Sequence, residues 1–280
     1  MIFWNIRDCW KKYALRSGIF WALSICIAVV YRLIGVERFQ FLVRLLSERM
    51  PVTLSFVSWK DILLVEENFY SLFLVLYQIW FGYTLMKDTK KVWEEDRQTG
   101  RVYYFVNQLV TKSRYFAGKM LAVGINFFLM LSIYYIGLFM VWGISGCFFK
   151  GFALGGYLLR SFAVFGILVA IELLWCSFRN ERREDYFEES MIGGTLFLGN
   201  VHRFLAFFLA IIRLMGRSGG ILYKLRRIMI PLYWVSPISW LDPFHRFTPD
   251  DTGIMFVVSI FVTSICIVFA HFFYTRKEII

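Results

Sequence analysis

Long apolar segments alternate with shorter polar ones along the chain, at lengths typical of helices that cross a membrane. A helix rises 1.5 Å per residue, so about 20 apolar residues cross the roughly 30 Å hydrocarbon layer. Six segments meet this requirement and predict six membrane-spanning helices: residues 17–36, 63–86, 120–143, 157–178, 191–214 and 253–274. The pattern therefore predicts an all-α, polytopic membrane protein, with one transmembrane domain over residues 1–280.

Two stretches outside these spans have distinct patterns. In residues 1–16 apolar and basic side chains fall on opposite helical faces, which predicts an amphipathic helix at the membrane interface. Residues 216–252 lie between the last two predicted spans and contain four prolines. For these we expect a re-entrant or surface-lying segment on the outer side.

The basic residues predict the orientation. Lys and Arg number 31 against 20 Asp and Glu, and they gather mainly at the ends of apolar runs. Residues 87–119 and 179–183 are polar stretches rich in basic residues, which favours a cytoplasmic position for both and for both termini. We expect a multi-pass protein of a bacterial plasma membrane.

Composition and motifs exclude several classes of protein. Hydrophobic residues make up 59% of the chain and aromatic residues 20%, too many for a soluble domain. The basic charge fits anionic lipid headgroups better than nucleic acid. The five cysteines have no metal-ligand spacing, so no metal site or disulfide framework is expected. The first residues interleave tryptophan and charged residues before any apolar core, so we expect no cleavable signal peptide.

Catalytic motifs are also missing from the sequence. Gly118 and Lys119 are followed by Met120, and no GxxxxGK[ST] phosphate loop is present. Glu188 and Glu189 are followed by Gly193 where the Glu-Glu-x-x-x-Arg motif of an intramembrane protease would have arginine. We therefore expect neither ATP hydrolysis nor another enzymatic activity from this chain.

The polar stretch of residues 87–119 contains an acidic cluster and then a glycine: Glu94, Glu95, Asp96 and Gly100. Beyond the glycine, apolar residues that include Phe105 and Leu109 recur at helical spacing and predict a short amphipathic helix along the inner membrane surface. A simpler interpretation is that the acidic residues only start a solvated helix, where the helix dipole favours negative charge.

Three ionisable residues lie inside predicted spans: Glu172, His202 and Arg203. Charged groups in a membrane are costly and often line a transport path. Pairing with a neighbour such as Arg182 is an alternative role for Glu172, and pairing between helices is an alternative for His202 and Arg203.

Short motifs occur at three places. The acidic cluster before Gly100 is followed by Ser113, Arg114 and Lys119. Residues 234–241 contain Ser236, Pro237 and Trp240, and residues 273–279 place a basic pair and an acid after an aromatic. Together with the six-span layout, these motifs resemble the membrane (permease) subunit of type-2 ATP-binding-cassette exporters. The chain departs from the family pattern at Arg101 and Lys112.

The resemblance implies a transport function without a cofactor on this chain. A dimeric cytoplasmic ATPase would bind ATP and Mg²⁺, and a second permease subunit, identical or homologous, would complete the complex in the lipid bilayer. The cargo would be a peptide, an antimicrobial or drug-like molecule, or another amphipathic compound. Contact with the ATPase would fall to Glu94, Glu95, Asp96, Gly100, Arg101, Phe105, Leu109 and Arg114. The alternative function is a secondary transporter or ion channel that uses Glu172, His202 and Arg203.

Overall fold

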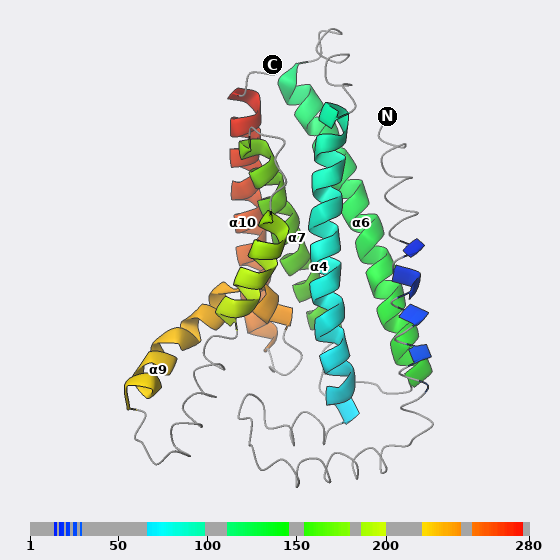
Figure 1. The fold of residues 1–280 in the computed structure, drawn as a ribbon, viewed down its shortest axis with the longest axis vertical. Coiled ribbons are helices and arrows are strands. Elements are labelled where there is room, and N and C mark those ends of the chain that lie inside the picture. The colour runs from blue at the N-terminus through cyan, green and yellow to red at the C-terminus, as the bar shows by residue number, and fades with distance from the viewer. Residues whose placement is uncertain are drawn as a thin grey trace.

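Four long helices lie side by side in the protein (Figure 1). They are α4 (Glu66–Gln98), α6 (Lys112–Ser145), α7 (Leu154–Phe178) and α10 (Pro249–Arg276). The computed structural model describes residues 66–98, 111–145, 154–179, 186–199, 220–241 and 248–276, with several helical positions between 14 and 29. For residues 66–76, 95–98, 141–145 and parts of 220–230 it describes the backbone alone.

The helices alternate in direction. Helices α4, α7 and α10 run toward one end of the bundle, while α6 and the helix of residues 187–199 start at that end and run away from it. Ring contacts fix these directions: Phe178 of α7 lies 5.4 Å from Phe273 of α10, and Trp93 of α4 lies 5.5 Å from Phe116 of α6. We call the end at which α4, α7 and α10 finish the basic end.

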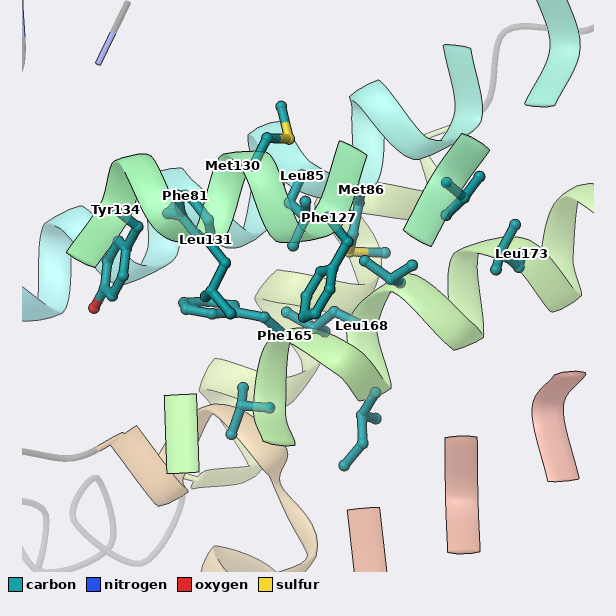
Figure 2. Packing of buried hydrophobic residues seen from close by; sticks show 14 of the residues in the cluster. Phe81, Leu85, Met86, Phe127, Met130, Leu131, Tyr134, Phe165, Leu168 and Leu173 are labelled. Atoms are coloured by element: carbon teal, nitrogen blue, oxygen red, sulfur yellow. The ribbon is translucent and has the colours of Figure 1, made fainter. Parts of the chain in front are cut away.

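Helix α7 lies at the centre of the bundle, between α10 and α4 (Figure 1). Its Phe165 ring lies 4.6 Å from Phe81 of α4 and 5.5 Å from Tyr134 of α6, and all three side chains are buried. Figure 2 shows these rings within a larger apolar cluster that also holds Leu168 and Leu173. Burial on several sides explains why α7 is apolar on most of its circumference, with few polar residues such as Arg160 and Glu172.

The described part of the chain is all helical and turn, without strands, which confirms the predicted all-α class. Three of its helices are long and apolar enough to cross a membrane: Lys112–Met140, Gly155–Phe178 and Pro249–Arg276. They correspond to the predicted spans 120–143, 157–178 and 253–274. The other predicted spans, 17–36, 63–86 and 191–214, lie partly outside the described residues, as does most of the interfacial helix of residues 1–16.

Two helix boundaries differ from the prediction. Helix α4 continues from the second predicted span to Gln98 instead of ending near Met86, and α6 begins at Lys112 instead of near Met120. The sequence from Lys87 to Gln98 contains neither proline nor glycine, so nothing in it stops the helix at the end of the apolar run. The polar stretch of residues 87–119 therefore begins and ends as extensions of long helices.

The described part of the predicted outer segment contains helix α9, the 3₁₀ helix η1 and the first residues of α10. Helix α9 (Gly220–Val235) projects sideways from the bundle in Figure 1 and contains Pro231. The 3₁₀ helix η1 (Pro237–Leu241) follows it and packs against α7, with Ser239, Trp240 and Leu241 buried. Residues 216–219 and 242–247 lie outside the described part.

Candidate functional site

An aromatic cluster joins three helices at the basic end. Trp93 of α4 makes edge contacts at 5.5 Å with both Phe116 of α6 and Tyr274 of α10. Tyr115 stacks on Tyr274 at 6.1 Å, and Phe116 meets the His271 ring at 5.0 Å. Edge and offset contacts of this kind add to the stabilisation from burial alone. The first and third motifs, far apart in sequence, therefore meet at this end.

Polar contacts reinforce the same junction between α6 and α10. Ser113 Oγ lies 3.2 Å from His271 Nε2, within hydrogen-bond distance. Lys112 Nζ donates to the Thr275 carbonyl oxygen at 3.4 Å. The first turn of α6 is thus bonded to the last turns of α10.

Lys119 connects α6 to the extension of α4. Its side chain is buried, and Nζ donates to the Val92 carbonyl oxygen at 2.7 Å. The Tyr115 ring lies 5.9 Å from the same ammonium. A buried ammonium is tolerated only where such partners replace water. The sequence motif included Lys119. Its partner, the backbone of α4, becomes known only from the way the helices pack.

Two ion pairs tie α4 to the helix of residues 187–199. Lys90 Nζ lies 3.0 Å from Glu188 Oε1, and the Glu188 side chain is only 2% exposed. Lys87 Nζ lies 3.5 Å from Glu189 Oε1, to which the Tyr83 hydroxyl donates at 2.6 Å. The pair of glutamates, which had no role in the sequence motifs, thus faces two lysines of α4.

The outer of these ion pairs shifts two pKa values. The hydrogen bond from Tyr83, with the nearby Lys87 charge, lowers the pKa of Glu189. A hydrogen bond with Tyr83, together with the carboxylate of Glu189, raises the pKa of Lys87. Both charged forms are therefore favoured in the folded protein.

The structure describes only part of the predicted ATPase-contact set. Glu94 is half-buried on α4, and Glu95 and Asp96 belong to the last helical turn before Gln98. Arg114 is exposed in the first turn of α6, where its backbone N–H donates to Thr111 Oγ1 at 3.4 Å. The remaining members lie outside the described residues: Gly100, Arg101, Phe105 and Leu109.

Glu172 is the one member of the predicted transport path that the structure describes. Its side chain is wholly buried in α7, and Cys176 Sγ donates to its Oε1 at 3.3 Å. His202 and Arg203 lie outside the described residues, and so does Arg182, the partner expected for Glu172. Whether these groups come together remains a prediction.

The second motif, near the opposite end, is bonded to the helix of residues 187–199 and within itself. Ser236 Oγ donates to the Thr195 carbonyl oxygen at 2.5 Å, and Ser239 Oγ donates to that of Tyr233 at 2.7 Å. Trp240 Nε1 donates to the Trp234 carbonyl oxygen at 2.9 Å. These bonds, with Pro237 starting η1, give Ser236 and Trp240 a structural role.

Arg160 is a buried cation that the sequence analysis missed. Its Nε donates to the Trp240 carbonyl oxygen at 3.1 Å and its Nη1 to Thr252 Oγ1 at 2.9 Å. It thereby joins α7, η1 and the start of α10. An arginine within an apolar run is itself a signal of a buried partner, which could have drawn attention to this position.

A hydroxyl network lies between α4, α6 and α7. The Tyr157 hydroxyl is hydrogen-bonded to Tyr134 and accepts a bond from Gln78 Nε2. Tyr77 stacks on Tyr134 at 5.0 Å and accepts a bond of 2.7 Å from Trp21 Nε1. Every member is paired inside the protein, which suits a buried polar group in an apolar bundle.

No known family model, curated protein sequence or solved structure matches this chain. Among the described residues no group of His, Cys, Asp and Glu is arranged to hold a metal ion. The resemblance to ATP-binding-cassette exporters thus rests on the motifs themselves.

Proposed function

We propose that this chain is the transmembrane permease subunit of an ATP-binding-cassette exporter, acting on a peptide, drug-like or other amphipathic cargo. The observation that supports this proposal is the extension of α4 to Gln98, held by Lys119, by Trp93 and by two ion pairs. A partner that moves the tip of α4 moves helices α6 and α10 with it.

The mechanism that follows is mechanical. An ATPase docked near Glu94, Glu95 and Asp96 would press on the end of α4 when ATP closes it. Because the attached helices shift as rigid elements, differential binding of ATP to the two arrangements would drive the change. ATP and Mg²⁺ belong to the ATPase, and a second permease subunit, identical or homologous, would form the other wall of the path.

The directions of the helices support the proposed orientation. Helices α4, α7 and α10 all end where Lys87, Lys90, Lys112 and Arg276 gather. A cytoplasmic basic end satisfies the excess of positive charge on that side of a bacterial plasma membrane. Both termini would then be cytoplasmic.

Glu172 favours a second candidate, a secondary transporter or ion channel. Its carboxylate is wholly buried in an apolar helix, and intramembrane acids often carry protons or ions. Under this proposal the chain would need no ATPase, and Glu172 would act with His202 and Arg203.

Purification of the tagged chain from its native membrane in mild detergent distinguishes the two. We expect an ATPase to co-purify and its hydrolysis to fall when Glu94→Gln and Asp96→Asn are combined. The matched control is Asp250→Asn, an exposed acid in the first turn of α10 at the opposite end. If no ATPase accompanies the chain, and Glu172→Gln abolishes an ion flux in vesicles, the exporter proposal is wrong.

A further inference from the structure

An apolar groove with a volume of about 340 Å³ runs between α6, α7 and α10. Its length follows from its lining residues, Met120 to Phe128 on α6 and Ser259 to Ile267 on α10. Eight residues of helix rise about 12 Å, so the groove is elongated along the helix axes. Its volume lies within the range of about 300–1,000 Å³ that is typical of small-molecule sites.

Glycines create this hollow. Gly124 of α6 and Gly166 of α7 both line the groove, and a Cβ added to either would meet no other atom within 4 Å. Ala163 and Ala170 of α7 also line the groove, and their small side chains leave its α7 side open. The space is therefore part of the packing and is not filled by a neighbouring side chain.

The groove opens to the outside of the bundle. Phe128 on α6 and Ile260 on α10 stand at its edges and are 59% and 51% exposed. The helices that form it are the three in the described part of the chain whose length and composition suit a membrane span. No charged residue is among those that line it. In a bilayer this groove would therefore face the acyl chains of lipids.

The basic end supplies the second half of the site. Lys112 and Arg114 lie in the first turn of α6, which contains no acidic residue, eight and six positions before Met120. Lys112 is half-buried against α10, and Arg114 is exposed. Basic side chains between membrane helices at the headgroup level are a general recognition feature for anionic lipids. The charge at this end of the groove thus complements a phosphate.

We propose that this groove holds one acyl chain of an anionic phospholipid, whose headgroup phosphate binds Lys112 and Arg114. The headgroup lies at the level of the first turn of α6, and the chain runs from there past Met120 toward Phe128. The helix rise places Met120 about 12 Å and Phe128 about 24 Å below Lys112. One headgroup layer and half of the hydrocarbon together measure about 21 Å, so most of the groove lies within one leaflet. Lipid binding here needs no ATPase, although Arg114 also belongs to the predicted ATPase-contact set.

Photocrosslinking of lipid to the full chain in nanodiscs tests the proposal. The probes are phosphatidylglycerol and phosphatidylcholine, each with a diazirine on one acyl chain, and crosslinked residues are mapped by mass spectrometry. We expect phosphatidylglycerol to label the groove residues of α6 and α10 more than phosphatidylcholine does. Labelling should exceed that at Val257 and Phe261, which are exposed on α10 outside the groove.

Two sets of variants separate the chain site from the headgroup site. Gly124→Leu and Gly166→Leu fill the groove, and we expect labelling to fall about four- to fourteenfold, the change expected when one or two methylene groups lose their buried place. Gly253→Leu, which also adds a side chain to open space, should leave labelling unchanged. Lys112→Gln with Arg114→Gln should remove the preference for phosphatidylglycerol, whereas Lys91→Gln on α4 should keep it.

Each alternative result has a definite meaning. Equal labelling by the two lipids in the unmodified chain overturns the headgroup site. Labelling no stronger in the groove than at Val257 and Phe261, or unaffected by the leucine variants, overturns the acyl-chain site. If the leucine variants do not fold, as judged by gel filtration, Gly124→Ala and Gly166→Ala provide the same comparison with less added volume.

Discussion

At the residue scale, single polar groups determine how the helices are held together. Arg160 satisfies a carbonyl oxygen of η1 and a hydroxyl of α10 at once. Gly199, the last described residue of the helix of residues 187–199, lies so close to η1 that a Cβ would approach Ser239 Oγ to 2.8 Å. Substitution of Arg160 therefore removes hydrogen bonds, whereas substitution of Gly199 adds atoms where there is no space for them.

Replacing Arg160 should destabilise the protein strongly. In Arg160→Ala the Trp240 carbonyl and the Thr252 hydroxyl lose a charged donor, and we expect a loss of about 2–4 kcal/mol in the free energy of unfolding. Arg114→Ala, which removes an exposed arginine, should change it by less than about 0.5 kcal/mol. Denaturant titration in detergent micelles measures both. Equal effects of the two substitutions would contradict the role given to Arg160.

Two glycines of one helix should respond to alanine with opposite signs. Gly199→Ala forces Ser239 and Ser236 to move, and should destabilise the protein by about 1–3 kcal/mol. Gly193→Ala adds a methyl group to open space and a better helix former, so it should stabilise the protein by up to about 1 kcal/mol. Thermal unfolding midpoints of the two variants provide the test, and a stabilised Gly199→Ala would show that η1 does not pack there.

At the element scale, the extension of α4 is held by contacts from three other helices. Lys119 of α6, Tyr274 of α10 and Glu188 of the helix of residues 187–199 each reach it. These partners are separated from their α4 residues by long stretches of chain. The extension therefore depends on tertiary contacts more than on its own helix propensity.

Removal of the Lys119 ammonium should loosen this extension. In Lys119→Met the Val92 carbonyl loses its buried donor, so backbone amides of residues 88–98 should exchange with deuterium faster. The control is Lys91→Met, at an exposed position on α4 itself, which should leave the exchange of these amides unchanged. Hydrogen exchange followed by mass spectrometry resolves this peptide. Identical protection in both variants would show that Lys119 does not hold α4.

The ion pair between Lys87 and Glu189 should make the attachment of α4 depend on pH. The lowered pKa of Glu189 means that its contribution is complete above the ordinary carboxyl value of 4.5 and is lost as pH falls through the lower folded value. The raised pKa of Lys87 means that its contribution is complete below 10.5 and is lost as pH rises through the higher folded value.

Unfolding midpoints of the native chain and of Glu189→Gln, measured across this range, test the pair. The difference between the two proteins should be constant between these limits and should shrink at lower pH. Added salt should reduce it as well, because both side chains are partly exposed. A difference that grows on acidification would contradict the assignment.

At the scale of the whole molecule, the sequence was informative where apolar runs were long. Spans 120–143, 157–178 and 253–274 fall inside α6, α7 and α10, because about 20 consecutive apolar residues strongly favour a membrane helix. Helix ends were less predictable, since charged residues such as Lys112 and Glu94 continue a helix once it is held by neighbours.

The site was predictable only as separate motifs. The sequence indicated polar stretches near Ser113 and Tyr274, but their meeting through Trp93 depends on the packing of three helices. Arg160 and Trp240 are 80 residues apart, and no local pattern relates them. Long-range partners of this kind follow from the fold and cannot be read from spacing along the chain.

Orientation in the membrane is the prediction that belongs to the whole molecule. In a background without native cysteines, Asp250→Cys should react with a membrane-impermeant thiol reagent in intact cells. Lys91→Cys should react only after the cells are made permeable, because basic ends face the cytoplasm. Both positions are exposed in the protein. The reverse pattern would invert the proposed topology.

The length of α4 has a mechanical consequence. Its 33 residues measure about 50 Å, whereas the hydrocarbon layer is roughly 30 Å thick. With the predicted span of residues 63–86 in the bilayer, about 20 Å of helix would stand beyond it as a lever arm. A stroke of about 3 Å at the tip would turn such an arm by about 9°. In the proposed exporter such a turn would move the far end of the roughly 30 Å segment inside the membrane by about 4.5 Å, so a small displacement at the surface would become a larger one within the bilayer.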